Sequence, residues 1–175
     1  HLLKKTISEW KSEIIAAQKR IREMLELDPS LFAYPYGEAS KEIASFLREK
    51  TFIAAFGQHS GVASEWLDPF YLPRFSFNEK YGDIARFTLA VNSLPLPIKE
   101  ITPSQMILVI NPPIFGFTMA SDTLNTDKLQ CFSSAQSVAG RIERLAKKRI
   151  EVSFIIVIAD NTCSFVNVVS TLPKL

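Results

Sequence analysis

The stretch LFAYPYGEASKEIASFLREKTFIAAFG, residues 31–57, decides the fold of this chain. It opens with an apolar run, Leu31 to Tyr34, which predicts a short buried strand closed by the turn Pro35-Tyr36-Gly37. A helix follows over roughly Ser40 to Glu49, and a second apolar run, Thr51 to Phe56, predicts another buried strand. Strand, helix and strand at this spacing indicate a parallel sheet with a crossover helix. The helix should turn three apolar residues inward: Ile43, Phe46 and Leu47.

A longer helix is predicted ahead of this stretch. Thr6-Ile7-Ser8-Glu9 matches a capping box, in which the Thr hydroxyl and the Glu carboxylate each accept from a free amide of the first turn. We expect the helix to end near Leu27, because Asp28-Pro29 follows. Apolar residues recur behind the box at steps of three and four and form one stripe: Trp10, Ile14, Ala17, Ile21 and Leu25.

In parallel sheets with crossover helices, ligands bind beyond the carboxyl ends of the strands. The sequence therefore predicts a site built from Tyr34 to Glu38, after the first strand, and Gly57 to Gly61, after the second. Leu72-Pro73-Arg74-Phe75 predicts a third short strand. Residues 84–93 predict a helix that carries Phe87, Val91 and Leu94.

The second half of the chain has a different pattern. Residues 94–98, Leu-Pro-Leu-Pro-Ile, are extended and stiff like a linker, and we place a domain boundary near residues 97–103. The sequence thus predicts two parts, 1–98 and 99–175. In the second part only residues 139–148 look helical. Runs rich in β-branched and aromatic residues alternate with turn formers and predict a small antiparallel β module: residues 105–110, 115–119, 129–132, 150–158 and 163–169.

Composition restricts the function classes. With 175 residues, 47% of them hydrophobic, the chain can bury one good core or two small ones. The net charge is +2 with acids and bases mixed, so there is no basic stripe of the kind that binds nucleic acid. No apolar run approaches the roughly 20 residues of a transmembrane helix. Cys131 and Cys163 lie outside any CxxC or His-rich cluster, which makes a zinc site improbable and leaves buried thiols or a disulfide as alternatives.

Phe32-Ala33-Tyr34-Pro35-Tyr36-Gly37-Glu38 is the most informative heptapeptide of the chain. It resembles the third motif of the polysaccharide deacetylase (NodB-homology, carbohydrate esterase) family, an Arg-x-Pro-Tyr-Gly sequence that ends a barrel strand. The resemblance covers about residues 2–98, and residues 111–118 are more weakly similar to a β appendage of some bacterial members. Further similar segments follow in order and at family-like spacing: Ala55-Phe56-Gly57-Gln58, Ser60-Gly61, Leu72-Pro73-Arg74-Phe75, Tyr81-Gly82-Asp83 and Arg86-Phe87.

The resemblance implies both a fold and a chemistry. The family's fold is a deformed (β/α) barrel, so this chain would be α/β, part of such a barrel followed by a small antiparallel β module. Family members hydrolyse N-acetyl groups of β-linked N-acetylglucosamine polymers, using a divalent metal, usually zinc, held by one Asp and two His. The two motifs that carry these ligands are absent, and the second would end just ahead of His1, which should not itself be a ligand. The chain also begins without Met or a signal peptide, so it is expected to be a fragment that binds no catalytic metal and does not turn over alone.

Two positions are candidate catalytic residues through this resemblance. Tyr36 matches the Tyr whose backbone N–H stabilises the tetrahedral oxyanion, unless its segment is only a strand-to-helix turn. Arg74 lies where the family's Leu-x-His motif offers a general acid. Because Arg does not give up its proton at neutral pH, it would bind sugar hydroxyls, orient a carboxylate or form a surface salt bridge. Ala33 replaces the family Arg that orients the catalytic base.

Five residues are candidate substrate-binding positions: Tyr34, Pro35, Gly37, His59 and Trp66. His59 is either a substitute acid at the second strand end or an incidental loop histidine. Trp66 and Tyr71 suit stacking on a sugar ring and suit core packing equally well.

The expected partner is a polysaccharide, which implies a periplasmic, extracellular or envelope-associated protein. One alternative is a non-catalytic carbohydrate-binding or assembly module whose β half is the functional part. Another is an α/β domain whose similar segments are coincidental. Because a truncated barrel exposes strand edges, we expect this chain alone to aggregate or oligomerise.

Overall fold

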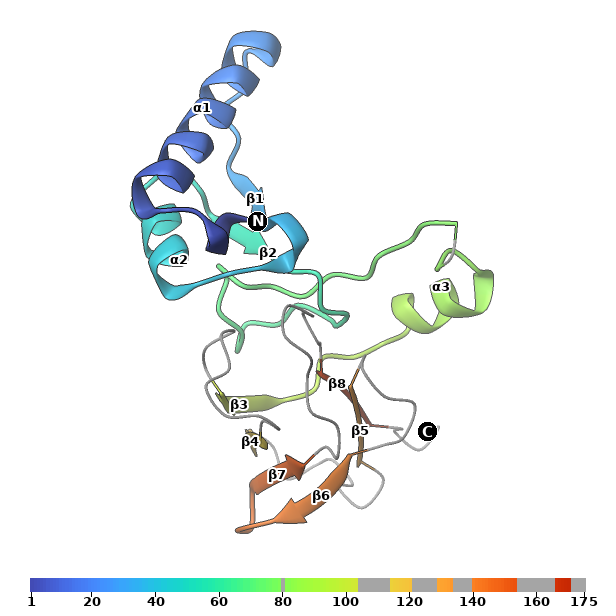
Figure 1. Cartoon of the computed structure of the whole chain (residues 1–175). Helices are drawn as coiled ribbons and strands as arrows, with labels where there is room; N and C mark the ends of the chain where they lie inside the picture. Colours follow the sequence, from blue (N-terminus) through green and yellow to red (C-terminus); the bar gives the residue numbers. More distant parts are fainter. Residues whose placement is uncertain (80, 104–113, 121–128, 134–139, 154–165, 171–175) are drawn as a thin grey trace.

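The computed structural model describes residues 1–79, 81–103, 114–120, 129–133, 140–153 and 166–170. They form two groups of elements, each with its own core (Figure 1). The first group contains η1 (Leu2–Lys4), α1 (Ile7–Leu25), β1 (Leu31–Ala33), η2 (Pro35–Gly37), α2 (Lys41–Arg48), β2 (Ala54–Phe56) and α3 (Ile84–Val91). The second contains β3 (Ile98–Thr102), β4 (Ile114–Met119), β5 (Leu129–Ser133), β6 (Arg141–Arg144), β7 (Arg149–Ser153) and β8 (Val166–Ser170). The chain is therefore of mixed helix and strand content.

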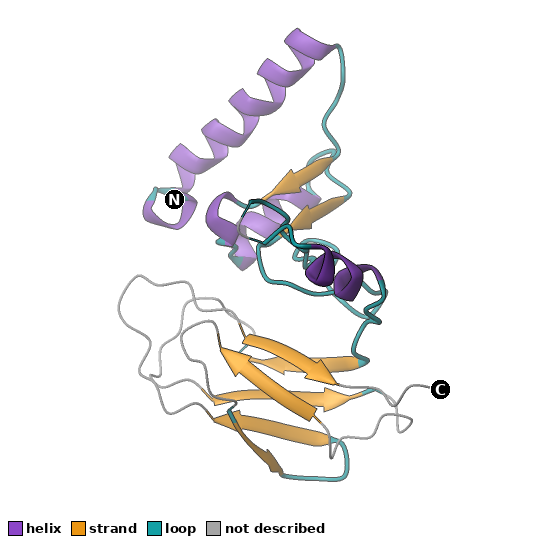
Figure 2. Cartoon of the chain, turned by 90° about the vertical axis from the view of Figure 1, so that its right-hand side faces the viewer, coloured by secondary structure: helices purple, strands orange, loops and turns teal. Residues whose placement is uncertain are grey.

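Helix α1 starts with the predicted capping box. The Glu9 amide donates to Thr6 Oγ1 at 3.4 Å, and the Thr6 amide donates to the Glu9 carboxylate at 2.8 Å. The apolar stripe is buried only over its first half, where Trp10 and Ile14 are each 4% exposed. The second half of the helix extends away from the β1–β2 pair (Figures 1 and 2), and Leu25 is exposed there.

Strands β1 and β2 pair in parallel, as predicted, with Phe32 opposite Ala55. Helix α2 connects them, and its three predicted inward residues are buried, as Leu47 at 0% exposed illustrates. The predicted third strand is present only as a parallel bridge between Leu72 and Phe56. Among the described residues no strand pairs with the other edge of β1.

The first core lies between this short sheet and helices α1 and α2. Phe32 packs edge-to-face against Tyr34 and Phe52, at ring-centroid distances of 5.3 and 5.5 Å. Trp10 reaches the same core from α1 and packs edge-to-face on Phe46 at 5.3 Å. Helix α3 is present as predicted but buries none of its residues; its Phe87 contacts the Phe77 ring at 5.7 Å.

The second part is antiparallel, as predicted. Four strands pair in the order β3-β4-β7-β6, and β5 pairs separately with β8. The two sheets pack face to face (Figure 2), since one core cluster takes residues from both of them. That cluster consists of Phe117, Met119, Leu129, Cys131, Ile150 and Val152.

The structure corrects the prediction of a helix over residues 139–148. Residues 141–144 form strand β6, which pairs with β7 in an antiparallel hairpin. Ile142 packs on the core while Arg141 and Glu143 lie exposed on either side of it in sequence and pair with each other at 3.0 Å. Alternation of this kind suits a half-buried strand, and pairing with β7 outweighs the helical propensity of the charged residues.

The proline-rich segment belongs to the β part and is not a free linker. Ile98–Thr102 forms β3, Leu96 and Ile98 pack on the second core, and the Ala120 amide donates to the Pro97 carbonyl at 2.7 Å. Cys131 is a fully buried free thiol, and burial raises its pKa to about 12. Three predicted features lie outside the described residues: the strand at 105–110, the segment 111–113 and Cys163.

In the part of the chain that the structure describes, no helix combines the length and the apolar character needed to cross a bilayer.

Candidate functional site

The turn after β1 and the loop after β2 lie against each other. A Cβ added to Gly37 would lie 2.9 Å from both the Cβ and the backbone nitrogen of Gln58. Gly37 also has φ 72°, a left-handed conformation that a side chain disfavours. Glycine is therefore required where the two segments meet. The structure brings together the two segments that the sequence singled out.

Tyr36 has an unusual backbone conformation within this turn. Its φ of 58° and ψ of 12° are left-handed, which is uncommon for a residue with a side chain. The turn is closed by the amides of Gly37 and Glu38, which donate to the carbonyls of Tyr34 at 2.9 Å and Pro35 at 3.2 Å. These bonds do not use the Tyr36 amide. The Tyr36 side chain is 57% exposed, and Pro35 is exposed beside it.

His1 and Glu38 contact the Tyr36 turn, although the sequence analysis gave neither of them a role: Glu38 only ended the predicted segment, and His1 was expected not to be a ligand. The His1 ring stacks on the Tyr36 ring with a centroid distance of 4.2 Å and an interplanar angle of 12°. His1 Nδ1 lies 2.8 Å from Glu38 Oε1. The second carboxylate oxygen, Oε2, is shielded from solvent and has no hydrogen-bond partner among the described residues. Glu38 belongs both to the predicted segment after the first strand and to the motif heptapeptide, but neither signal indicated its contact with His1.

The Tyr34 side chain points into the core rather than toward the loops. It is 2% exposed, and its hydroxyl donates to the Phe70 carbonyl at 2.8 Å. Burial raises the pKa of its hydroxyl far above the ordinary value, so it stays protonated. Because Tyr34 already has its partner in the core, its side chain is not presented to a ligand.

His59 lies at the end of β2, as predicted, and its ring is largely buried. Its ring centroid is 4.6 Å from that of Tyr71, and a Cβ on Gly57 would come within 2.7 Å of its Nδ1 atom. Burial lowers the pKa of His59 to about 4, so the imidazole is neutral near pH 7. A neutral imidazole of this kind is a poor proton donor, which does not favour the role of substitute acid.

Arg74 holds the loop that follows β2. Its Nε donates to the Gly57 carbonyl at 2.8 Å, and its amide donates to the His59 carbonyl at 3.0 Å. A longer bond of 3.5 Å joins Nη1 to Ser76 Oγ. None of these partners is a carboxylate, so the surface salt bridge considered for this residue does not describe its contacts.

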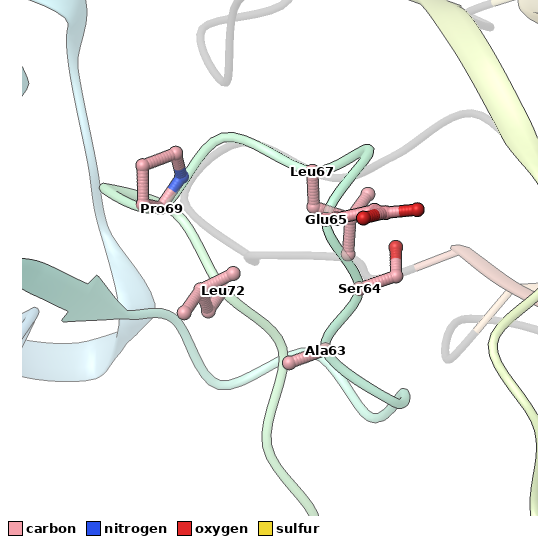
Figure 3. Close-up of a pocket in the computed structure, with 6 residues that line it drawn as sticks. All are labelled: Ala63, Ser64, Glu65, Leu67, Pro69 and Leu72. Carbon is pink, nitrogen blue, oxygen red and sulfur yellow. The ribbon is translucent and has the colours of Figure 1, made fainter.

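A hollow of about 410 Å³ lies beside the loop that contains Trp66 (Figure 3). Its walls come from the chain between Ala63 and Leu72, with the Glu65 carboxylate at one side. None of the seven predicted site residues lines it. Trp66 lies between the lining residues Glu65 and Leu67 in the sequence and is 49% exposed to solvent. Tyr71, in contrast, packs against Tyr34 and His59.

Two features bear on the chemistry that the family resemblance implies. Across the described ranges, no group of three or more His, Cys, Asp and Glu side chains is placed to hold a metal ion. Ala33 ends β1 with an exposed methyl group where the family has Arg. The described residues therefore do not provide a ligand set for the family's divalent metal.

Comparison with known proteins gives no match to a family model, a curated protein or a solved structure.

Proposed function

We propose that this chain is the C-terminal part of a polysaccharide deacetylase. The intact protein would hydrolyse N-acetyl groups of an N-acetylglucosamine-type polymer. The observation that carries the proposal is the meeting of the Tyr36 turn and the Gly57–Gly61 loop at the carboxyl ends of parallel strands β1 and β2. Sheets of this kind place their ligand sites at that end.

The Tyr36 turn supplies the oxyanion-binding part of this proposal. A non-glycine residue held in a left-handed conformation is strained, and such strain is found preferentially at functional sites. The bonds that close the turn leave the Tyr36 amide aside. In the proposed reaction this amide donates to the oxygen of the tetrahedral intermediate, where a fixed backbone donor is most effective.

Arg74 acts in the proposal as a positioning residue, not as the general acid. Its two bonds to backbone carbonyls fix the Gly57–Gly61 loop, which packs on Gly37. In the proposal the exposed Trp66 ring, and the side of the Tyr36 ring away from His1, stack on a pyranose.

The second edge of β1, which pairs with no strand among the described residues, supports the idea that the sheet continues into a barrel. Tyr34 donates to Phe56 O at 2.9 Å, and Ser30 O accepts from Ile53 at 2.8 Å, so alternate backbone groups of β1 face β2. In a parallel pair, the backbone groups of the intervening residues, Leu31 and Ala33, then face the open side. The proposal places the remaining strands, the metal ligands and the catalytic base in polypeptide ahead of His1.

Acetate release tests this function. The intact protein, incubated with zinc and acetylated chito-oligosaccharide, is expected to release acetate, and the 175-residue chain alone is expected to release none. If the intact protein released none, the enzyme assignment would be abandoned.

A second candidate is a non-catalytic carbohydrate-binding or assembly module. It is favoured by Ala33 and Arg74, which stand where the family has an Arg and a His. Binding of the same oligosaccharide by the intact protein, measured calorimetrically without any acetate release, would support this alternative.

A further inference from the structure

We infer that His1 and Glu38 are positioning residues that hold the Tyr36 turn in its left-handed conformation. This inference rests on the proposed function insofar as the turn serves catalysis; the contacts themselves do not depend on it. Both residues act through Tyr36.

The first step is the placement of His1. Leu2 is 5% exposed, and the one-turn helix η1 that follows is closed by bonds from the Lys4 amide to the His1 carbonyl at 3.4 Å and from the Lys5 amide to the Leu2 carbonyl at 3.1 Å. The burial of Leu2 and this turn fix the backbone next to His1. The imidazole is thereby directed onto the Tyr36 ring, 35 positions further along the chain.

The second step is the orientation of the ring. Nearly parallel stacking, at 12° and 4.2 Å, is a single weak contact at an exposed position, and it does not by itself keep the imidazole over the Tyr36 ring. The bond between His1 Nδ1 and Glu38 Oε1, at 2.8 Å, adds the second contact that keeps the imidazole in the stack. It also requires a hydrogen on Nδ1, since a carboxylate only accepts.

The third step is the closure of the unit. The Glu38 amide donates to the Pro35 carbonyl at 3.2 Å, so the residue that holds the His1 ring is itself tied to the turn. Three contacts thus form a closed ring: Glu38 bonds to Pro35 through the main chain, His1 bonds to the Glu38 carboxylate, and His1 stacks on Tyr36. The left-handed conformation is intrinsically unfavourable for Tyr, and these three contacts stabilise it.

Selective histidine labelling tests these contacts, because the chain contains two histidines, His1 and His59, whose signals can be told apart. Histidine labelled at Cε1 gives two NMR signals, which His1→Gln assigns. The His1 signal is expected upfield of its position in a short peptide, because the Tyr36 ring current acts on it, and Tyr36→Leu should abolish that displacement. The His59 signal reports whether each variant stays folded.

Glu38→Ala is the decisive variant. It keeps the His1 and Tyr36 side chains in the sequence but removes the acceptor that holds them stacked, so the His1 signal is expected to move to the peptide position while the His59 signal stays. Glu38→Gln keeps an acceptor oxygen and should restore most of the displacement. Glu23→Ala, a change at an exposed helix position, is the matched control and should leave both signals unchanged. A His1 signal at the peptide position in the unmodified chain, or one that Glu38→Ala leaves unmoved, overturns the inference.

Kinetics of the intact protein separate this inference from the proposed function. If the intact protein releases acetate, Glu38→Ala should lower its kcat with little change in KM, and Glu38→Gln should retain most of the original kcat. If the NMR coupling were present without any acetate release, the function would fail and the positioning of Tyr36 would stand. If acetate were released at full rate by Glu38→Ala, the positioning role would fail and the function would stand.

Discussion

Arg74 Nε donates to the carbonyl oxygen of Gly57 at 2.8 Å, which joins the segment after the Leu72 bridge to the end of strand β2. The Arg74 amide adds a second bond, to the His59 carbonyl at 3.0 Å. This backbone-directed guanidinium links the loop after β2 to the neighbouring segment of the sheet.

Replacing Arg74 by Ala should therefore loosen the loop. Loss of a charged donor to a backbone oxygen is expected to lower the free energy of unfolding by about 1–2 kcal/mol. Urea unfolding followed by circular dichroism measures the change, and Arg20→Ala, on the exposed face of α1, is the control. An unchanged unfolding midpoint for Arg74→Ala would show that its bonds do not stabilise the loop.

Tyr34→Phe should destabilise the first core. The hydroxyl is the described donor to the Phe70 carbonyl in a site where Tyr34 is 2% exposed, so its removal leaves a buried acceptor unpaired. The expected loss is about 1–2 kcal/mol, from the same unfolding measurement. Tyr36→Phe, which alters an exposed ring, should change the stability by less than about 0.5 kcal/mol. Equal effects of the two substitutions would argue against a buried hydrogen bond at Tyr34.

His59 should make the stability of the chain depend on pH. Its pKa is lowered from 6.5 to about 4 in the folded state, so the unfolded chain binds the proton more readily between these values. Stability is therefore complete above pH 6.5 and falls as the pH falls toward 4, by at most about 3 kcal/mol. Unfolding midpoints measured at pH 7.5 and 4.5 are expected to differ less in His59→Gln than in His1→Gln, which retains the buried imidazole. A pH dependence that His59→Gln does not reduce would contradict a buried neutral His59.

The edge of β1 that no described strand covers should make the isolated chain associate. Leu31 is 56% exposed there, and its backbone groups face away from β2. Light scattering is expected to show oligomers or aggregates, and Leu31→Lys should reduce them because a charge on an edge strand opposes pairing. Leu145→Lys, at an exposed position in the turn after β6, is the matched control. A monodisperse monomer for the unmodified chain would refute the prediction.

Local patterns account for what could be predicted of the fold. The capping box at Thr6 depends on residues close in sequence, and the parallel pairing of β1 with β2 follows from the order of strand, helix and strand; both are present. The apolar stripe of α1 indicated which face of the helix is apolar, but not which residues would pack on it. At Leu25 no described residue buries that face. The pattern around Ile142 suited a strand as well as a helix, and only the partner strand β7 decided between them.

The candidate site was predictable in outline but not in its side chains. The order of strand, helix and strand located the two loops, because parallel strands end at the same edge. The alternation of side chains along a strand places Tyr34 on the same face as Phe32, in the core. The family motif instead led to Tyr34 being predicted as a substrate-binding residue. The stacking of His1 on Tyr36 joins residues far apart in the sequence, and no local pattern could predict it.

The central claim is tested most directly by comparing acetate release by the intact protein with release by its Gly37→Ala variant. Both are incubated with zinc and acetylated chito-oligosaccharide. Ala at Gly37 would meet Gln58 at 2.9 Å in a left-handed turn, so it should displace the Tyr36 amide. Losing one oxyanion donor predicts a decrease in rate of about a hundredfold, while Leu145→Lys keeps the full rate. Release that Gly37→Ala leaves unchanged, or no release by the unmodified intact protein, would contradict the account.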